Sequence, residues 1–346
     1  MKATSQKALK KLKAAVIGLP EDHKHKSGVR YEKTIKIIGL ILIVAAIAAG
    51  AVIAGNHFLM QSDIDEQPSE TQTTQAVSTE DNVLNPEDVE WNGNKFKVVN
   101  NDGLVNILLI GQDRREGEGR QRSDAMILCS FNPETNKLSM ISFLRELYVQ
   151  IPGYEDNRLN AAYAYGGFEL LKETLELNFG ISVDGCLESD FEGFEKIIDT
   201  VGGVDIELTA KETEIVGNGA SEGLCTLNGE QALTYARIRK IDSDFQRTAR
   251  QRKIMGAVFE KAKTYTLSEL AMFFSEILPL MSTDMTEDEM MALDLSFASS
   301  FRDIKTESYI VPAEGTYKNA MIREMAVLVP NLYEIRKLIF EEYLPM

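Results

Sequence analysis

A strongly basic stretch lies between residues 237 and 253, within the acidic part of the chain that follows residue 58. It holds seven Lys or Arg residues against two Asp, whereas the whole 346-residue chain has a formal net charge of −16. Arginine side chains and helix N-termini both suit phosphate groups, and a phosphate or pyrophosphate ligand needs such a local positive region. A solvated basic face is the alternative interpretation. The acidic balance of the chain argues against nucleic acid as a partner.

Two helices are expected to position these arginines. A short helix is predicted to start near Asn228, and Arg237 and Arg239 follow it, pointing the same way if the chain is extended there. A second helix is predicted over residues 244–263. Its inward stripe consists of Ile254, Val258 and Ala262. Asp244, Arg247 and Gln251 are spaced i, i+3 and i+7, so they are expected on one face of this helix.

A predicted β-hairpin brings a carboxylate opposite an arginine. Two strand-like runs, residues 125–131 and 137–144, are separated by the turn-forming segment NPETN. If the centre of the hairpin lies between residues 134 and 135, Asp124 faces Arg145 at its open end. The open end of the hairpin is therefore a candidate functional site, because it brings a carboxylate and an arginine together.

Asp113 follows another strand pattern, the continuous apolar run of residues 104–111, which is typical of a strand buried on both faces. Ligands usually bind at the carboxyl ends of strands in α/β sheets. Asp113, Asp124 and several arginines are therefore expected at one rim of the sheet. The alternative is that each is a solvated charge at a strand end.

Glycines mark the ends of two further predicted helices. Residues 168–179 have helical spacing and stop at Gly180, and a helix that begins near residue 191 ends at Gly202 and Gly203. Residues 205–208 are then predicted to form a short strand. These elements separate the first candidate residues from the basic stretch.

The histidines and cysteines exclude several kinds of chemistry. Beyond residue 57 there is no histidine, which excludes Ser-His-Asp and Cys-His triads and zinc-protease motifs there. Any chemistry must use Asp, Glu, Arg, Lys, hydroxyls or a metal. Cys129 is expected in a buried strand, and the sequence leaves open a disulfide between Cys186 and Cys225. The histidines are His23, His25 and His57.

An uncharged apolar run, residues 37–55, divides the chain. As a helix it would span about 28 Å, close to the hydrocarbon core of a bilayer. Residues 1–36 hold ten Lys or Arg and three Asp or Glu, a net charge of +7, which favours a cytoplasmic N-terminus and an extracytoplasmic C-terminal domain. A cleaved signal peptide is the alternative. The segment before the apolar run and the run itself are both longer than those of a typical signal peptide.

Four segments are expected on this basis. Residues 1–36 form a basic cytoplasmic tail, and residues 37–58 form a transmembrane signal-anchor in the lipid bilayer. Residues 59–95 are polar and acidic and are predicted to be a disordered linker. Residues 96–346 form the extracytoplasmic domain.

Six motifs, in this order along the chain, resemble those of the LytR-CpsA-Psr family of bacterial cell-wall phosphotransferases. G-x-D-x-R starts at Gly111, R-S-D is Arg122-Ser123-Asp124, and N-A-A-Y follows Arg158-Leu159 and precedes Gly166-Gly167. D-x-x-G-G-V is residues 199–204, G-x-x-A-L-x-Y-x-R-x-R is residues 229–239, and D-x-x-R-x-x-R-Q starts at Asp244. Two departures occur. The family's S-x-P-R-D is S-F-L-R-E at residues 142–146, and its lysine before N-A-A-Y is Arg158.

The resemblance implies an α/β fold, a three-layer α/β/α domain with a central mixed sheet, preceded by one transmembrane helix. It implies an apolar pocket for a polyprenyl chain, with a pyrophosphate site at its mouth. The reaction would move a polyprenyl-pyrophosphate-linked glycopolymer, such as teichoic acid or capsule polysaccharide, onto a hydroxyl of peptidoglycan in a Gram-positive bacterium. A pyrophosphate hydrolase and a non-catalytic protein that binds anionic polysaccharide are the alternatives.

The resemblance also assigns roles to residues. Asp113 and Asp124 would bind Mg²⁺ or Mn²⁺, and one of them, or Asp244, would deprotonate the sugar hydroxyl. Gln251 would orient a phosphate or an arginine. The catalytic candidates are Asp113, Asp124, Arg145, Arg237, Arg239 and Asp244. The pyrophosphate-binding candidates are Arg115, Arg122, Arg158, Arg247, Arg250 and Gln251.

Overall fold

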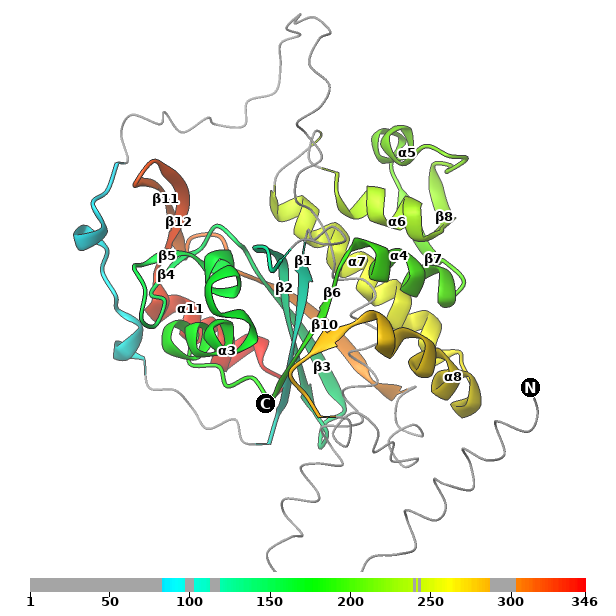
Figure 1. Ribbon diagram of the computed structural model, residues 1–346, viewed down its shortest axis with the longest axis horizontal. Helices are drawn as coiled ribbons and strands as arrows, with labels where there is room; N and C mark the ends of the chain where they lie inside the picture. The colour runs from blue at the N-terminus through cyan, green and yellow to red at the C-terminus, as the bar shows by residue number, and fades with distance from the viewer. Residues whose placement is uncertain (1–82, 97–102, 113–118, 239–240, 242–243, 287–302) are drawn as a thin grey trace, which may run out of the picture.

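The computed structural model describes residues 83–96, 103–112, 119–238, 241, 244–286 and 303–346. At the centre of these residues is a six-stranded sheet in the order β10-β3-β2-β1-β6-β9 (Figure 1). The sheet is mixed, as expected, because β1 runs antiparallel to β2 and parallel to β6. Its strands are β1 Val105–Gln112, β2 Ser123–Asn132, β3 Lys137–Phe143, β6 Gly185–Ser189, β9 Ser282–Thr283 and β10 Lys305–Val311.

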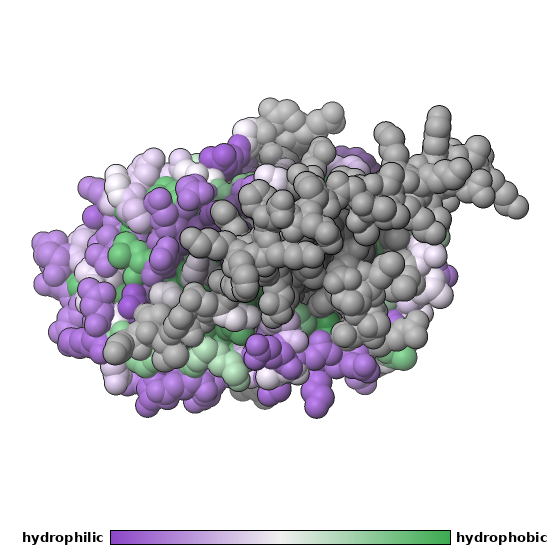
Figure 2. Space-filling view, turned by 90° about the horizontal axis from the view of Figure 1, so that it is seen from below, coloured by the Kyte–Doolittle hydropathy of each residue, from purple (hydrophilic) through white to green (hydrophobic). Residues whose placement is uncertain are grey.

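Helices cover both faces of the sheet, so the expected three-layer α/β/α architecture is confirmed (Figure 1). Helices α3 (Leu159–Phe179) and α11 (Leu332–Leu338) pack on one face. The other face is covered by α4 Phe191–Thr200, α6 Gly229–Ala236, α7 Asp244–Lys263 and α8 Leu267–Ile277. On the side shown in Figure 2, the described surface is mostly hydrophilic, with small hydrophobic patches.

Alternation along the strands separates the two cores. Successive side chains of a strand point to opposite faces, and in β1 Leu108 and Ile110 pack in the core beneath α3. Ile107 and Leu109 pack in the core beneath α4 and α7. All eight residues of β1 are buried, which confirms the predicted strand with two covered faces.

Smaller elements surround these layers. Among the described residues, three two-stranded sheets pair β4 with β5, β7 with β8 and β11 with β12. Their bounds are β4 Tyr148–Val149, β5 Asn157–Arg158, β7 Val204–Leu208, β8 Gly223–Leu227, β11 Tyr317–Ile322 and β12 Met325–Pro330. Helix α5 covers Ala210–Val216, and single 3₁₀ or π-helical turns occupy Pro86–Asp88, Gly93–Lys95, Leu278–Leu280 and Ile339–Tyr343.

The β2–β3 hairpin has the register that the sequence predicts. Ile127 pairs with Ser142 and Asn132 pairs with Lys137, so the pairing is centred between residues 134 and 135. The Asn132 side chain closes the turn, since its Oδ1 accepts hydrogen bonds from the backbone N–H of Glu134 and Thr135 at 2.8 and 3.2 Å. This Asx turn lies in the turn-forming segment that the sequence predicts for the tip of the hairpin.

Helix ends agree with the sequence except at the start of α3. Gly180 takes the left-handed conformation with φ 75° and ends α3. However, α3 begins at Leu159, well before the predicted residue 168, because Gly167 at φ 68° kinks the helix and interrupts its apolar pattern. Helix α7 has the predicted bounds. Its predicted inward stripe, Ile254, Val258 and Ala262, is fully buried.

The folded region starts earlier than residue 96, which corrects the predicted linker boundary. Val89 is buried, and the ring of Trp91 stacks on Tyr148 with centroids 6.0 Å apart. The Arg336 side chain donates from Nη1 to the carbonyl of Gly93 at 3.0 Å. Residues 83–95 thus pack against the domain instead of belonging to the spacer.

The predicted anchor at residues 37–58 lies outside the described residues, as do the tail and most of the linker. Among the helices that the structure does describe, none combines the length and the apolar character needed to span a membrane.

The start of α6 offers a direct test of the fold. Asn228 caps this helix, and it forms a capping box with Gln231 in which each side chain bonds the other's backbone N–H at 2.9 and 3.1 Å. Asn228→Ala should lower the free energy of unfolding by about 1 kcal/mol. Asn228→Asp keeps the capping oxygen and should stay near wild type. Denaturant unfolding checks both, and equal stability of the Ala variant would contradict the capping role.

Candidate active site

Asp124 and Arg145 form an ion pair at the open end of the β2–β3 hairpin. Nη1 of Arg145 lies 2.6 Å from Oδ1 of Asp124, with the Asp124 side chain 7% exposed. The pair follows from the hairpin register, which places the two positions opposite each other just beyond the last paired residues. The predicted meeting of these two residues is therefore confirmed.

Glu146 holds Arg145 from a second side. Nε of Arg145 donates to Oε1 of Glu146 at 2.5 Å, so the longer acid at this position still reaches the arginine. Burial acts to lower the pKa of Arg145, but the charges of Glu146 and Asp124 and their hydrogen bonds raise it above the ordinary arginine value. The guanidinium is therefore permanently charged and fixed in orientation.

Two more arginines belong to this region. Nε and Nη2 of Arg158 donate to the carbonyl of Ala326 in β12 at 3.1 and 2.5 Å. Burial lowers the pKa of Arg158, Glu146 raises it, and the positive charges of Arg145 and Arg122 lower it further. Arg122 lies two residues before Asp124, at the same end of the sheet. We call this set the Arg145 cluster: Arg122, Asp124, Arg145, Glu146 and Arg158.

A buried polar network lies beside the cluster, at the same end of the sheet. The backbone N–H of Gln121 donates to Oε1 of Gln112, and Nε2 of Gln112 donates to Oε1 of Glu188, both at 2.5 Å. The hydroxyl of Tyr163 donates to Oε2 of Glu188 at 2.5 Å. Because Glu188 is only 4% exposed, its charge depends on these donors. We call these four residues the Glu188 network.

The Glu188 network ties together both ends of the β1–β2 connection. Gln112 is the last residue of β1, and Gln121 directly precedes Arg122. Arg120 lies over the ring of Tyr163, 5.7 Å from its centroid. It also lies against Gly167, where an added Cβ would be 2.7 Å from its Cζ. Sequence reasoning missed this network, although a single acid in a buried parallel strand is a signal that it needs partners.

The described arginines of the basic stretch lie with the helices on the other face of the sheet. Arg250 is 3% exposed, and it donates to Oε1 of Glu212 and to the carbonyl of Ile238, each at 2.9 Å. Arg237 lies over the ring of Phe191 at 4.7 Å. These contacts give Arg250 an internal role. Its predicted binding to pyrophosphate stays a prediction, as does that of Arg237.

Arg247 and Gln251 share one face of α7, as predicted, and both are buried, at 1% and 2% exposure. Asp244 is the first residue of α7. The structure thus positions Arg247 and Gln251 rigidly near the start of this helix. Three other candidates, Asp113, Arg115 and Arg239, lie outside the described residues.

The described residues supply some, but not all, of the oxygen ligands that a hard divalent cation such as Mg²⁺ needs. Asp124 supplies a carboxylate, the oxygen donor that Mg²⁺ and Mn²⁺ prefer. Asp113 directly follows Gln112, whose strand partner is Ser123, the neighbour of Asp124. Within the described ranges no group of three or more His, Cys, Asp or Glu could hold a metal ion. Two protein carboxylates would therefore need ligand or water oxygens to complete a coordination shell.

The three cysteines are free, so the disulfide that the sequence left open between Cys186 and Cys225 is not formed. Cys129 and Cys186 are fully buried in the central sheet, as expected for Cys129. Burial raises the pKa of both thiols well above the ordinary value. Neither thiol is suited to nucleophilic chemistry.

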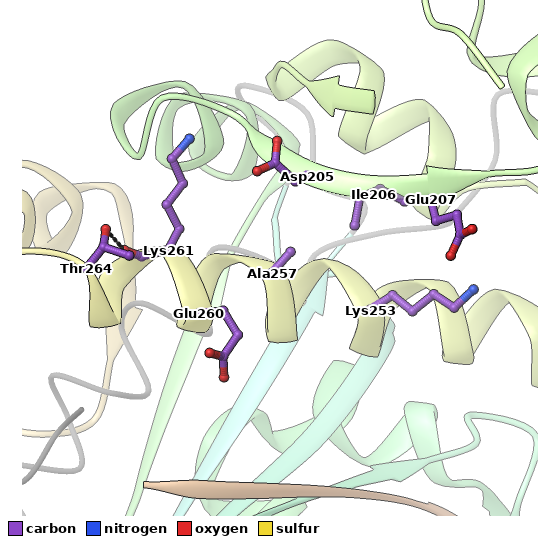
Figure 3. Close-up of a pocket in the computed structure, with 8 residues that line it drawn as sticks. All are labelled: Asp205, Ile206, Glu207, Lys253, Ala257, Glu260, Lys261 and Thr264. Atoms are coloured by element: carbon purple, nitrogen blue, oxygen red, sulfur yellow. Dashed lines mark hydrogen bonds between the residues drawn. The ribbon is translucent and has the colours of Figure 1, made fainter. Parts of the chain in front are cut away.

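A groove of about 560 Å³ lies elsewhere, between β7 and the outer side of α7 (Figure 3). Lys253 and Glu207 lie at one end of it, and Thr264 and Lys261 at the other. Lys261 is engaged in the structure, because its Nζ donates to the carbonyls of Gly202 and Gly203 at 2.6 and 2.7 Å. This mixed-charge groove is unlike the apolar lipid pocket that the resemblance implies, which stays a prediction.

Comparison with known proteins identifies relatives of this sequence and this fold. The model of the LytR_cpsA_psr family matches residues 64–337. The polyisoprenyl-teichoic acid–peptidoglycan teichoic acid transferase TagU of Bacillus mycoides (strain KBAB4) is 32% identical over 234 residues, 66% of this chain and 75% of TagU. The regulatory protein MsrR of Staphylococcus aureus (strain COL) is 33% identical over 226 residues, 64% of this chain and 68% of MsrR. A structure described as TagT bound to LI-WTA has a TM-score of 0.57 at 25% identity and covers 72% of this chain and 94% of its own.

The Glu188 network can be tested by stability measurements. Glu188→Leu removes the acceptor of two buried donors and should lower the free energy of unfolding by about 1–3 kcal/mol. Glu188→Gln keeps one acceptor oxygen and should cost less. The unfolding of the full chain can be followed by the fluorescence of Trp91, its single tryptophan.

The matched control is Glu192→Gln on the exposed face of α4, where Glu192 pairs with Lys196. Its effect should stay within about 0.5 kcal/mol. A Glu188→Leu variant no less stable than this control would show that the network does not depend on the carboxylate.

Proposed function

The chain belongs to the LytR_cpsA_psr family, and we propose that it is a phosphotransferase that moves a glycopolymer from a polyprenyl-pyrophosphate carrier onto peptidoglycan. The product would be a phosphodiester between the two polymers. The name of the relative TagU describes a transferase of this kind. The TagT structure of the same fold is described as bound to LI-WTA.

The observation that carries this proposal is the Arg145 cluster at one end of the central sheet. Phosphoryl transfer requires little covalent chemistry from the protein, so positioning and charge stabilisation dominate. Arg145 is fixed by Asp124 at 2.6 Å and by Glu146 at 2.5 Å. A guanidinium held in this way needs no reorganisation when negative charge develops on the phosphate oxygens.

The proposed reaction is a displacement at phosphorus, in which one P–O bond forms and another breaks. The oxygen of a sugar hydroxyl attacks the phosphorus that carries the glycopolymer, and the bond from this phosphorus to the bridging oxygen breaks. Polyprenyl phosphate leaves with the bridging oxygen. The proton of the hydroxyl passes to a carboxylate, for which Asp113, Asp124 and Asp244 are the candidates. Arg237, Arg239 and Arg247 would bind pyrophosphate oxygens from the α7 side of the sheet.

We propose Mg²⁺ or Mn²⁺ as the cofactor, bound by Asp113 and Asp124. Support comes from the donor chemistry, because carboxylate oxygens suit these ions and phosphate oxygens complete their octahedral shells. When bound, the ion would neutralise charge on the pyrophosphate. Arg145 would keep the Asp124 carboxylate oriented, since it holds one oxygen of that group.

We also propose that the chain is anchored in the cell membrane by residues 37–58, with the N-terminus cytoplasmic and the catalytic domain outside. The support is the uncharged run of residues 37–55 after a basic head. The relatives come from Bacillus and Staphylococcus, which are Gram-positive bacteria. A lipid-linked donor and a wall acceptor would both be within reach of such a domain.

The role of Arg145 can be tested by polymer transfer. Arg145→Ala should reduce the rate by roughly 10²–10³-fold, the usual loss when one charge-stabilising donor is removed. Arg145→Lys keeps the charge but loses the planar fork that meets two carboxylates, and it should remain impaired. Full-length protein, a polyprenyl-pyrophosphate sugar donor and peptidoglycan fragments are the components of the assay.

Lys196→Ala is the matched control, since it removes an exposed cation on α4 that pairs with Glu192 and should transfer normally. Circular dichroism establishes that each variant is folded. Normal transfer by a folded Arg145→Ala protein would remove the cluster from the reaction. Release of polyprenyl phosphate at a rate independent of acceptor would instead favour a hydrolase.

The metal proposal has a readout that does not depend on activity. Mg²⁺ alone should raise the melting temperature of the full chain little, and it should raise it more when a polyprenyl pyrophosphate is present. Asp124→Asn should abolish this additional shift, whereas Glu192→Gln on α4 should preserve it. An additional shift of unchanged size in Asp124→Asn would exclude this residue as a metal ligand.

A further inference from the structure

Two exposed tyrosines stack on each other close to the candidate site. Tyr154 is 53% exposed and Tyr165 is 41% exposed. Their ring centroids lie 4.9 Å apart at an interplanar angle of 21°. Single exposed apolar side chains are ordinary on protein surfaces, but a stacked aromatic pair keeps a large ring surface open to solvent in a defined geometry. We call this pair the tyrosine platform.

Surrounding contacts hold the tyrosine platform in place without a ligand. Nδ2 of Asn157 donates to the hydroxyl of Tyr165 at 2.9 Å, and the backbone N–H of Tyr154 donates to the carbonyl of Ile151 at 3.0 Å. Arg323 in the turn between β11 and β12 reaches the same segment. Its Nη1 lies 3.0 Å from Oε2 of Glu155 and donates to the carbonyl of Asp156 at 3.1 Å. A preorganised surface loses little freedom when it binds.

The tyrosine platform adjoins the Arg145 cluster through α3. Arg158 of the cluster is the residue that precedes this helix. Side chains two residues apart in a helix point in directions about 200° apart. Tyr163 therefore faces inward to Glu188, and Tyr165 faces outward. The link to the cluster is β5 (Asn157–Arg158), because the Asn157 amide bonds the Tyr165 hydroxyl at 2.9 Å and its neighbour Arg158 belongs to the cluster. A ligand several sugars long can therefore contact both the platform and the cluster.

We propose that the tyrosine platform binds the glycan strand of the peptidoglycan acceptor, outside the sugar that reacts. This inference rests on the proposed transfer to peptidoglycan. The electron-rich face of an aromatic ring attracts positively polarised C–H groups, and the faces of pyranose rings present such groups. The Asn157 amide and the Glu155 carboxylate border the platform and can bond sugar hydroxyls and acetamido groups.

Charge favours the acceptor over the donor as the occupant. Glu155 and Asp156 lie in the segment between Tyr154 and Asn157, and Arg323 is the cation that the described contacts place there. An anionic glycopolymer or an anionic lipid surface would meet carboxylates beside the rings. A glycan strand of N-acetylated sugars brings fewer negative charges per ring and can place them away from the rings.

Acceptor kinetics with the full-length protein in nanodiscs test this proposal. The probes are chitotetraose for direct binding by NMR and peptide-free glycan strands of peptidoglycan as acceptor. Tyr154→Ala and Tyr165→Ala should weaken chitotetraose binding and raise the acceptor KM by roughly 2- to 12-fold. The donor KM and the kcat at saturating acceptor should not change. Tyr154→Phe keeps the ring and should behave as wild type.

Tyr333→Ala is the matched control, because Tyr333 is a comparably exposed tyrosine at the start of α11. An unchanged acceptor KM in both platform variants, with transfer by the wild type intact, would overturn the platform alone. Weakened binding to anionic vesicles in place of glycan would also overturn it. If the wild type neither bound the donor nor transferred polymer, the proposed function itself would fail.

Discussion

The pairing register of β2 and β3 is the constraint on which the candidate site depends. A slip of one residue would turn every side chain of a strand to the opposite face, exchange the two cores and separate Asp124 from Arg145. The register is fixed twice, by the Asx turn at Asn132 and by the burial of alternate residues beneath different helices. The 2.6 Å contact between Asp124 and Arg145 is its most direct consequence.

Buried hydrogen bonds to Glu188 then connect the elements at this end of the sheet. Glu188 lies in a parallel strand with both faces covered, where an unpartnered carboxylate would be very costly. Its two donors, Gln112 and Tyr163, come from β1 and α3, so one charge connects three elements at the end of the sheet. The same requirement explains Arg250, whose guanidinium is satisfied by Glu212 and a carbonyl.

Local signals in the sequence predicted much of this structure. The hairpin register, the cap at Asn228, the bounds of α7 and the stop at Gly180 each depend on a few neighbouring residues, and all are confirmed. What depends on distant contacts was missed. The packing of Trp91 on Tyr148, which places residues 83–95 in the domain, was not predicted. Strand β6, the first part of α3 and the partners of Glu188 were not predicted either, because each depends on residues far away in the sequence.

The charges of the Arg145 cluster alone would not neutralise the proposed pyrophosphate ligand. Three arginines and two carboxylates leave one net positive charge, while a pyrophosphate joined at both ends carries two negative charges. Neutralising the ligand therefore requires further positive charge. A divalent cation on Asp124 and Asp113, or the arginines of residues 237–253, could supply it. The proposed function therefore gives the basic stretch of residues 237–253 and the Asp124–Arg145 pair one common role, which is to balance the charge of the pyrophosphate.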